Sequence, residues 1–279
     1  MTSNAPQKPV VLITGANWHG IGGGLARELH RQGYRVFATG RDLSRLSEYA
    51  ELGIETLKLD VTDVASIHSC KFEVEKLTGG KLDILINNAG RTCAEPALDQ
   101  QQESLREVFE VNTIGTMNVT QTFGPLVVNA KGKIVFVTSA SSLTSAPFSG
   151  VYHGSKAAVN QYSESLRLEM APLGVGVLRI FVGGVRTELF RPSRMPKFLE
   201  GSVYKPCEPS YLTILQQTGP KMPSPDEFSK SVVPSIINAK TSGDIWGGYL
   251  ASVTWFMLKV LPSWLMDYAL SSQFGLAKI

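Results

Sequence analysis

Short apolar runs alternate with longer amphipathic stretches along most of the chain. The runs are rich in Val, Ile and Leu without strict alternation, as expected for strands buried on both faces of a parallel sheet. They lie at Val10–Thr14, Arg35–Thr39, Glu55–Leu59, Asp83–Asn87, Lys133–Thr138 and Val175–Val182. Helices are expected between them, near residues 21–32, 42–51, 63–78, 101–130 and 154–171. This order predicts an α/β fold with a single doubly wound parallel sheet of the Rossmann type and helices on both faces.

The pattern changes after residue 187. Residues 188–223 carry six prolines without a clear period, which indicates a loop or short broken helices. We interpret this stretch as a lid. Ser224 then has the form of a helix N-cap, with Pro225 as the first helical residue and Glu227 closing a capping box. The helix is expected to reach about Ala239, with a kink at Pro234.

Composition narrows the class of protein. Of 279 residues, 27 are Lys or Arg and 24 are Asp or Glu, which is too balanced for a nucleic-acid binder. Hydrophobic residues make up 43%, too many for a disordered chain. The three cysteines, Cys70, Cys93 and Cys207, have neither disulfide nor metal-binding spacing, and the first residues form no secretory signal. We therefore expect a cytoplasmic globular protein without a bound metal.

The C-terminal part departs from that average. Residues 246–274 hold seven of the 24 aromatic residues (12 Phe, 8 Tyr and 4 Trp), including Trp246, Trp255 and Trp264. The apolar run 249–261 is too short to cross a bilayer, contains Lys259 and ends at Pro262. Three alternatives remain open: the segment packs as core, lines an apolar substrate pocket, or lies on a membrane surface. We divide the chain into a catalytic domain, 9–250, and an apolar extension, 251–279.

A glycine-rich turn follows the first predicted strand. The stretch Thr14–Gly22 places Gly15, Gly20 and Gly22 between that strand and a helix. Glycines let the backbone approach a pyrophosphate, and the free amides and dipole at the helix start attract its charge. This context predicts dinucleotide binding. Trp18 either covers the phosphates or packs outward.

The ends of the next strands refine the cofactor. The second ends in Gly40-Arg41, without the acidic residue that usually holds the ribose of NAD, and Arg41 suits a 2′-phosphate; we expect NADP(H). Asp60, after the third strand, either reaches an adenine edge or caps the next turn. After the fourth strand, the small residues Ala89 and Gly90 permit close cofactor approach, and Asn88 can secure neighbouring backbone.

A proton-transfer group is predicted at the fifth strand. Tyr152 and Lys156 share one face at the start of the following helix. A nearby ammonium favours the phenolate and lowers the tyrosine pKa, which makes Tyr152 a workable acid or base. Ser139 ends the strand and can hydrogen-bond the substrate oxygen. Asn112 lies in the preceding helix and is placed to hold a water that relays protons to Lys156.

Together these residues resemble the short-chain dehydrogenase/reductase family over about residues 9–250. The resemblance rests on the glycine turn, the Asn87–Gly90 stretch, Asn112, Ser139 and Tyr152-His153-Gly154-Ser155-Lys156, in the family's order and spacing. It implies that the catalytic residues are Asn112, Ser139, Tyr152 and Lys156. It also implies that the cofactor contacts are Gly15, Gly20, Ile21, Gly22, Arg41, Asp60, Asn88, Tyr152, Lys156, Val185 and Thr187.

Two departures from the family's pattern are visible. Four residues, in place of the usual three, separate Gly15 from Gly20. After the sixth strand the usual Pro-Gly is replaced in Val182-Gly183-Gly184, which puts the rigidity of that loop in doubt. His153 is interpreted as a neighbour that shapes the site. Cys93 has no visible base and is not expected to be a nucleophile.

Both departures resemble a fungal subgroup similar to NADPH-dependent 1-acyl-dihydroxyacetone-phosphate reductases. The resemblance implies an NADPH-dependent carbonyl reductase that acts on a bulky lipophilic ketone, with 1-acyl-dihydroxyacetone phosphate as the leading candidate. A ketoreductase or alcohol dehydrogenase of fungal secondary metabolism, acting on a polyketide or terpenoid, is the alternative, and a non-enzymatic dinucleotide-binding scaffold is a remote one. The implied partners are a lipophilic ketone or alcohol and further copies of the chain. Peripheral attachment to endoplasmic reticulum or lipid droplets is an additional expectation.

Overall fold

The computed structural model describes residues 8–187 and 198–279. Its seven strands form one parallel sheet in the order β3-β2-β1-β4-β5-β6-β7. The order reverses beside β1, the place where open α/β sheets bind ligands. The strands are β1 (Val10–Ile13), β2 (Arg35–Gly40), β3 (Glu55–Lys58), β4 (Ile84–Asn87), β5 (Lys133–Val137), β6 (Gly176–Val182) and β7 (Gly243–Gly247).

Helices follow most of the strands, and several short turns join them. The α-helices are α1 (Ile21–Arg31), α2 (Val64–Thr78), α3 (Gln102–Phe109), α4 (Gly115–Ala130), α5 (Gly150–Met170), α6 (Glu208–Thr218), α7 (Pro225–Asn238), α8 (Ala251–Val260) and α9 (Ser263–Gln273). The 3₁₀ segments are η1 (Leu43–Leu52), η3 (Ala140–Ser142), η4 (Ala171–Leu173), η7 (Lys205–Cys207), η8 (Gly219–Lys221) and η9 (Leu276–Lys278). A π-helical turn, η2 (Glu110–Ile114), joins α3 to α4.

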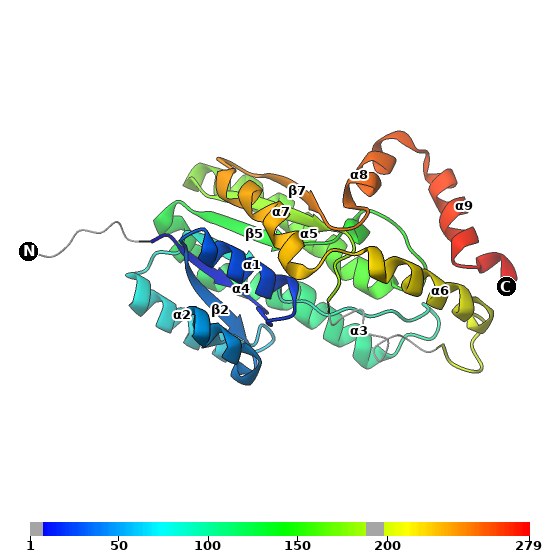
Figure 1. Ribbon diagram of the computed structural model, residues 1–279, viewed down its shortest axis with the longest axis horizontal. Coiled ribbons are helices and arrows are strands. Elements are labelled where there is room, and N and C mark those ends of the chain that lie inside the picture. Colours follow the sequence, from blue (N-terminus) through cyan, green and yellow to red (C-terminus); the bar gives the residue numbers. More distant parts are fainter. Residues whose placement is uncertain (1–7, 188–197) are drawn as a thin grey trace, which may run out of the picture.

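Alternate residues of each central strand enter different cores. In β1, Val11 and Ile13 pack with α1 and α7, whereas Val10 and Leu12 pack with α2, α4 and α5. Successive side chains of a strand point to opposite faces, so a sheet covered on both sides must be apolar at every position. The three layers are visible in Figure 1. The predicted fold class is therefore confirmed, including helices on both faces.

Six predicted strands are present, with ends displaced by at most a residue or two. The structure adds β7, which the sequence pattern missed because Gly243, Asp244 and Gly247 leave no apolar run there. Hydrogen bonding to β6 makes it the edge strand. The predicted helix over 101–130 is interrupted by the π-helical turn, and the predicted capping box of Ser224 and Glu227 is present. Helix α7 continues through Pro234.

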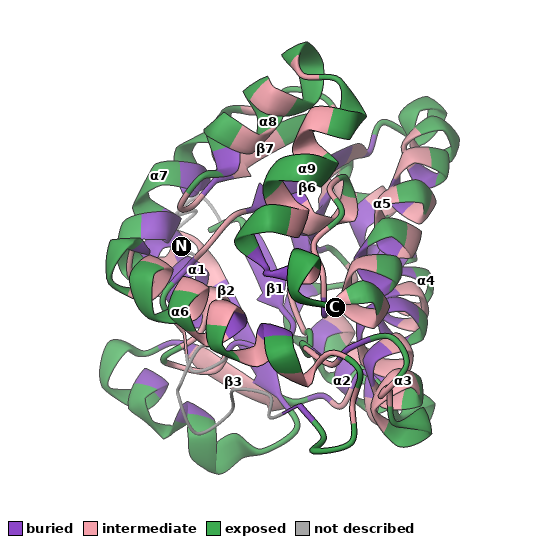
Figure 2. Cartoon of the chain, turned by 90° about the vertical axis from the view of Figure 1, so that its right-hand side faces the viewer, coloured by how far each residue is buried: buried purple, intermediate pink, exposed green. Residues whose placement is uncertain are grey.

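The predicted lid lies partly outside the described residues, because 188–197 are not described. The rest of it forms α6 between two 3₁₀ turns. Figures 1 and 2 place α6, α8 and α9 at the carboxyl end of the sheet.

An aromatic cluster connects these helices to the loop before α5. Phe148 contacts Phe198, Tyr204, Tyr211 and Phe274, with ring centroids 4.8 to 5.9 Å apart. Phe274 and its neighbour Leu270 are thus tied to the loop that leads to Tyr152.

The alternative that the C-terminal segment packs as core is wrong for α8 and α9. Ala251 is the one buried residue of α8, and α9 has none. Phe274, just after α9, is buried. Trp246 belongs to β7 and stacks on Phe181, with ring centroids 4.6 Å apart, so it is not part of the exposed segment. The two short helices, joined at Pro262, instead expose most of their apolar side chains (Figure 2).

Candidate active site

The glycine turn begins where β1 ends and closes at the first residue of α1. Gly15 has φ +62°, a left-handed conformation that favours glycine, and a Cβ there would lie 2.8 Å from the Ala89 Cα. The Ala16 amide donates to the Thr39 carbonyl at 2.8 Å, and the Gly20 amide donates to Asn17 at 2.9 Å. Gly20 is the N-cap of α1, and it has no side chain with which to cap the amides at the helix start. This is the geometry that binds a phosphate group.

The additional residue of the turn is accommodated next to Trp18. The Arg27 guanidinium lies over the Trp18 ring at 4.3 Å, and its Nη1 donates to the Trp18 carbonyl at 2.8 Å. The Tyr49 ring packs edge-on against the Trp18 ring, with ring centroids 5.1 Å apart. The Tyr49 hydroxyl donates to the Ala16 carbonyl at 2.7 Å. Trp18 therefore packs against the core beside Tyr49 and Arg27, and the expected outward packing is not observed. Arg27 also pairs with Asp226 on α7 at 2.6 Å.

Asn88 fixes the glycine turn to the end of β4. Its side-chain amide donates to the carbonyls of Thr14 and Gly15 at 2.8 and 3.0 Å. A Cβ on Gly22 would lie 2.5 Å from that amide nitrogen, so glycine is required for this approach. Ile21 starts α1 and packs against the core on that side. A surface this close-fitting, with free helix amides, fits the pyrophosphate of a dinucleotide.

The next two strand ends present different groups. Arg41 is exposed and has no ion pair among the described residues, and the neighbouring Asp42 accepts from the Ser44 amide and hydroxyl. Asp42, the carboxylate that follows Arg41 in the chain, thus uses its Oδ1 to cap the turn at Ser44. Asp60 accepts from the Thr62 amide and hydroxyl at 3.0 and 2.8 Å, so its side chain caps the following turn, the structural alternative of the two.

Tyr152 lies in the first turn of α5, opposite the end of β5. It is hydrogen-bonded to Ser139, which lowers its pKa, but burial outweighs this and raises the pKa overall. The Ser139 hydroxyl also accepts from the Ser141 amide at 3.1 Å and lies 3.4 Å from the Val182 carbonyl. These contacts bring Ser139 and Tyr152 together as predicted.

Lys156 is buried one turn further along α5. Its Nζ donates to the Val137 carbonyl at 3.0 Å, and burial lowers its pKa from 10.5 to about 8. The expected lowering of the Tyr152 pKa by this ammonium does not appear: burial raises that pKa, and the lowering contribution comes from the Ser139 hydrogen bond. A Cβ on Gly90 would lie 3.4 Å from Lys156 Nζ and 3.5 Å from Asn112 Oδ1, so glycine leaves space where these groups converge.

Asn112 braces the site through its side chain. Its Oδ1 accepts from the Arg91 amide at 2.7 Å, and its Nδ2 donates to the Arg91 carbonyl and the Ser155 hydroxyl, both at 2.9 Å. Both ends of the side-chain amide thus bind protein groups, and the water relay through Asn112 stays a prediction. The π-helical turn at Asn112 is a local widening that is frequent at functional sites.

Ser155 is a site residue that the sequence did not single out. Its hydroxyl donates to the Tyr152 carbonyl at 2.7 Å and accepts from Asn112. It therefore connects the π-helical turn to the catalytic end of α5. Its position beside Lys156 is the signal that would have found it.

The loop after β6 is held without proline. The Gly183 amide donates to the Gly247 carbonyl at 2.8 Å, and Gly184 and Tyr249 exchange two hydrogen bonds, of 3.0 and 2.8 Å. These bonds supply the fixation that the missing Pro-Gly left in doubt. Val185 is buried beyond the bridge, and Thr187 is half-buried at the end of the described segment.

Burial shifts the pKa values of two further side chains, His153 and Cys93. Burial lowers the pKa of His153, whose ring lies 6.0 Å from that of Tyr152. Burial raises the pKa of the Cys93 thiol, which receives a hydrogen bond from Gln100. A neutral imidazole and a protonated thiol suit supporting positions.

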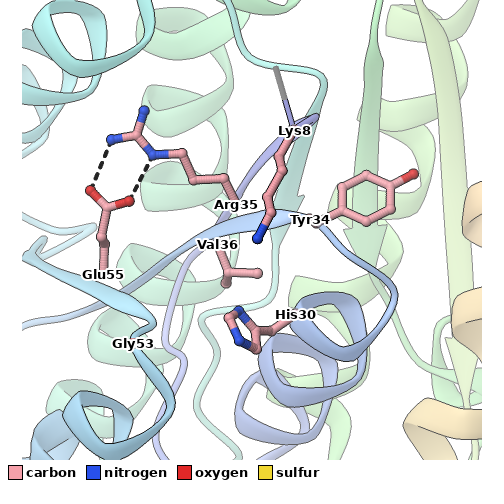
Figure 3. Close-up of a pocket in the computed structure, with 7 residues that line it drawn as sticks. All are labelled: Lys8, His30, Tyr34, Arg35, Val36, Gly53 and Glu55. Atoms are coloured by element: carbon pink, nitrogen blue, oxygen red, sulfur yellow. Dashed lines mark hydrogen bonds and ion pairs between the residues drawn. The ribbon is translucent and has the colours of Figure 1, made fainter. Parts of the chain in front are cut away.

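A separate surface pocket of about 350 Å³ lies at the opposite edge of the sheet. Its walls come from the residues before β1, the end of α1 and the starts of β2 and β3 (Figure 3). The Arg35 side chain lines this pocket, and its Nε pairs with Glu55 Oε1 at 2.7 Å. None of the predicted site residues lines this pocket.

Comparison with known proteins agrees with this geometry. A family model described as short chain dehydrogenase matches residues 9–197. A relative from Schizosaccharomyces pombe, named NADPH-dependent 1-acyldihydroxyacetone phosphate reductase, is 36% identical over 261 residues, which cover 87% of this chain and 86% of the relative.

Two further similarities extend along nearly the whole chain. Short-chain dehydrogenase ptmH from Penicillium ochrochloron is 36% identical over 276 residues, covering 97% of this chain and all of the relative. The crystal structure of a short-chain dehydrogenase from Streptomyces avermitilis superposes with a TM-score of 0.76 at 26% identity, covering 96% of this chain and 98% of that one.

Proposed function

The chain belongs to the short-chain dehydrogenase/reductase family and is an oxidoreductase acting on C=O or CH–OH groups, and we propose that it reduces a lipophilic ketone with NADPH. The observation that carries the proposal is the hydrogen-bonded pair of Tyr152 and Ser139, beside buried Lys156, at the carboxyl edge of the sheet. A general acid next to a second hydroxyl suits a developing alkoxide.

Preference for NADPH over NADH is supported at the end of β2. Arg41 is exposed and available to a 2′-phosphate, and the nearest carboxylate, Asp42, is occupied by Ser44. The name of the Schizosaccharomyces pombe relative includes NADPH dependence. The close-fitting turn between Gly15 and Gly22 holds the pyrophosphate in this proposal, and Val185 and Thr187 contact the nicotinamide end.

In this proposal each residue of the site has its own role in the reaction. When bound, NADPH would supply the hydride for the carbonyl carbon and leave as NADP⁺. Ser139 donates a hydrogen bond to the carbonyl oxygen, and Tyr152 transfers its phenolic proton to that oxygen, so that an alcohol results. Lys156 binds the nicotinamide ribose, and its positive charge stabilises the phenolate left on Tyr152. Asn112 keeps the Arg91 backbone and Ser155 in place.

The leading substrate candidate is 1-acyl-dihydroxyacetone phosphate. Support comes from the name of the Schizosaccharomyces pombe relative and from the apolar side chains of α8 and α9 at the carboxyl end of the sheet. Binding of the phosphate group of this substrate requires positively charged side chains near the site. Arg186 is exposed, and the sequence candidates Arg191, Arg194 and Lys197 lie outside the described residues.

A polyketide or terpenoid ketone is the second candidate. The same apolar surface serves it equally, and no phosphate-binding residues are needed. The Penicillium relative, matched over its full length, is named only as a short-chain dehydrogenase. The cation requirement therefore separates the two candidates.

The test is an NADPH-oxidation screen with the purified full-length chain. The panel contains 1-acyl-dihydroxyacetone phosphate, its dephosphorylated analogue, and long-chain and polycyclic ketones. Turnover of the phosphorylated ketone, with a lower KM than its analogue, is expected. Activity confined to ketones without phosphate would exclude the first candidate. NADPH binding without turnover of any ketone would favour the non-enzymatic scaffold.

We also propose that the active form is a homo-oligomer in the cytoplasm. Helices α4 and α5, which resemble the family's dimerisation helices, are 16 and 21 residues long, and α5 carries exposed Leu168. A mass measurement in solution tests this assembly. Attachment to endoplasmic reticulum or lipid droplets belongs to the same proposal.

A further inference from the structure

Helices α8 and α9 form an exposed apolar hairpin, here defined as residues 251–273. Apolar side chains that are largely open to solvent are Val253, Trp255, Phe256, Leu258, Val260, Trp264 and Tyr268. Only Lys259 and Asp267 carry charge in these two helices. Large exposed apolar surfaces on soluble proteins mark contact sites, so these side chains together indicate one.

The distribution of these side chains around α8 indicates what covers it. At 100° per residue, Val253, Phe256 and Val260 fall on one side of the helix, and Trp255 and Leu258 fall on the other. A groove on a folded protein covers a single stripe of a helix. A lipid phase surrounds a helix on several sides and therefore suits both sides of α8.

The lengths of the helices determine how deep such a contact goes. Helices of 10 and 11 residues extend about 15–17 Å, roughly half the apolar thickness of a bilayer. Among the described residues, no helix is both long and apolar enough to cross a membrane. Pro262, between the two helices, separates them into two short elements. The hairpin therefore fits the interfacial layer.

The polar groups of the hairpin match that layer. Trp255, Trp264 and Tyr268 combine an apolar ring with one hydrogen-bonding group, the chemistry found at membrane interfaces. Lys259 Nζ lies 4.3 Å from the centre of the Trp255 ring, so the single cation stays with an interfacial aromatic residue. From there its charge can reach phosphate headgroups.

Contacts with the rest of the fold fix the hairpin at both of its ends. Ala251 is buried at the start, beside Gly183 of the loop after β6. At the other end Phe274 is buried in the aromatic cluster, Cys207 Sγ contacts the Gly275 carbonyl at 3.3 Å, and Lys278 donates to Ser210 at 2.8 Å. The exposed surface is therefore a fixed part of the fold and not a loose end of the chain.

We propose that the apolar hairpin inserts into the interfacial layer of a phospholipid bilayer and holds the carboxyl edge of the sheet against the membrane. The hairpin lies at the carboxyl end of the sheet (Figures 1 and 2), the end at which β1 leads into the glycine turn and β5 leads toward α5. A lipophilic ketone dissolved in the bilayer then reaches the site without crossing water. The attachment itself does not depend on the proposed reductase activity.

The test uses flotation of the full-length chain with unilamellar vesicles of equal parts phosphatidylcholine and phosphatidylserine, without NADPH or ketone. The hairpin variant combines Phe256→Ser, Trp264→Ser and Tyr268→Ser, at side chains that are 59%, 66% and 71% exposed. The matched control combines Val64→Ser, Phe72→Ser and Leu98→Ser, at positions that are 52%, 64% and 76% exposed on the catalytic domain.

Wild type and control are expected to float with the vesicles, and the affinity of the hairpin variant is expected to fall by at least about tenfold. Unchanged thermal unfolding of both variants shows that they are folded. Equal flotation of the hairpin variant and the control would overturn the proposal. So would absence of vesicle binding together with self-association that the hairpin variant abolishes, because a second copy would then cover this surface.

Discussion

At the residue scale, burial of the Lys156 ammonium lowers the free energy of unfolding. Its ammonium is buried with one hydrogen bond, to Val137, and no carboxylate neutralises it there among the described contacts. Burial disfavours the charged form, which is why its pKa falls to about 8. A group retained at such a cost is typical of a functional site.

The cost predicts a pH-dependent stability. The folded protein releases the Lys156 proton near pH 8 and the unfolded chain near 10.5, so stability rises with pH across this interval and the full cost is present below it. Lys156→Met removes that titration. Without NADPH, the variant should be more stable than wild type at neutral pH by ~1–3 kcal/mol, and this advantage should shrink by ~2 kcal/mol near pH 9.5.

Urea unfolding at the two pH values measures this difference. Lys58→Met, at an exposed position of β3, is the control for loss of a lysine side chain. An advantage that stays constant or grows with pH would contradict the assignment of a costly buried charge to Lys156.

Arg27 is a positioning residue for the cofactor turn. It holds Trp18 through a hydrogen bond and a cation–π contact while Asp226 holds Arg27. Arg27→Met should raise the Kd for NADPH roughly fivefold, equivalent to about 1 kcal/mol. Titration of tryptophan fluorescence with NADPH measures binding without turnover. Arg31→Met, one turn later on α1, is the control, and equal Kd values for the two variants would refute the role.

At the element scale, glycines take over a task that the family usually gives to proline. The Gly183 amide binds the Gly247 carbonyl, and a side chain at Gly183 would collide with the Tyr249 carbonyl. Since this contact involves β7, which the sequence pattern did not reveal, the consequence of the missing proline could not be foreseen. A local motif does not show which distant strand completes it.

The sequence predicts most elements because their signals are local. Buried parallel strands need apolar residues at nearly every position, and Ser224, Pro225 and Glu227 mark the start of α7 within four residues. The π-helical turn at Asn112 escaped prediction because it depends on contacts with Arg91 and Ser155, which come from other segments.

The capping box gives a stability prediction. Ser224→Ala removes the acceptor for the Glu227 amide and the hydroxyl that donates to its carboxylate, and leaves the backbone amide of residue 224 as a donor. The unfolding free energy should fall by about 1 kcal/mol. Ser165→Ala, at an exposed position in α5, should change it by less than about 0.5 kcal/mol. Equal effects in denaturant unfolding would mean that the box contributes nothing measurable.

At the scale of the whole molecule, the proposed function assigns different tasks to two halves of the sheet. In that proposal the turn after β1, which Asn88 holds in place, binds the cofactor, and the end of β5 with the start of α5 transfers the proton. Family motifs mark each half in the sequence, and both roles stay predictions. The sequence did not decide how the C-terminal helices lie, because apolar composition alone fits a core, a pocket and a membrane surface.

Because the halves are separate, a variant in one of them leaves the other intact. Tyr152→Phe removes the phenolic proton and keeps the ring, whereas the contacts of the glycine turn are untouched. NADPH binding should persist, and the rate of catalysed proton transfer should fall at least ~100-fold.

The most direct measurement is the rate of NADPH oxidation with the best ketone of the screen, for wild type and Tyr152→Phe, at NADPH concentrations that fluorescence titration shows to be saturating for each. We predict turnover by wild type and loss of turnover by the variant, which still binds NADPH. A Tyr152→Phe protein that reduces the ketone at the wild-type rate would contradict the proposed role of Tyr152 as the proton donor.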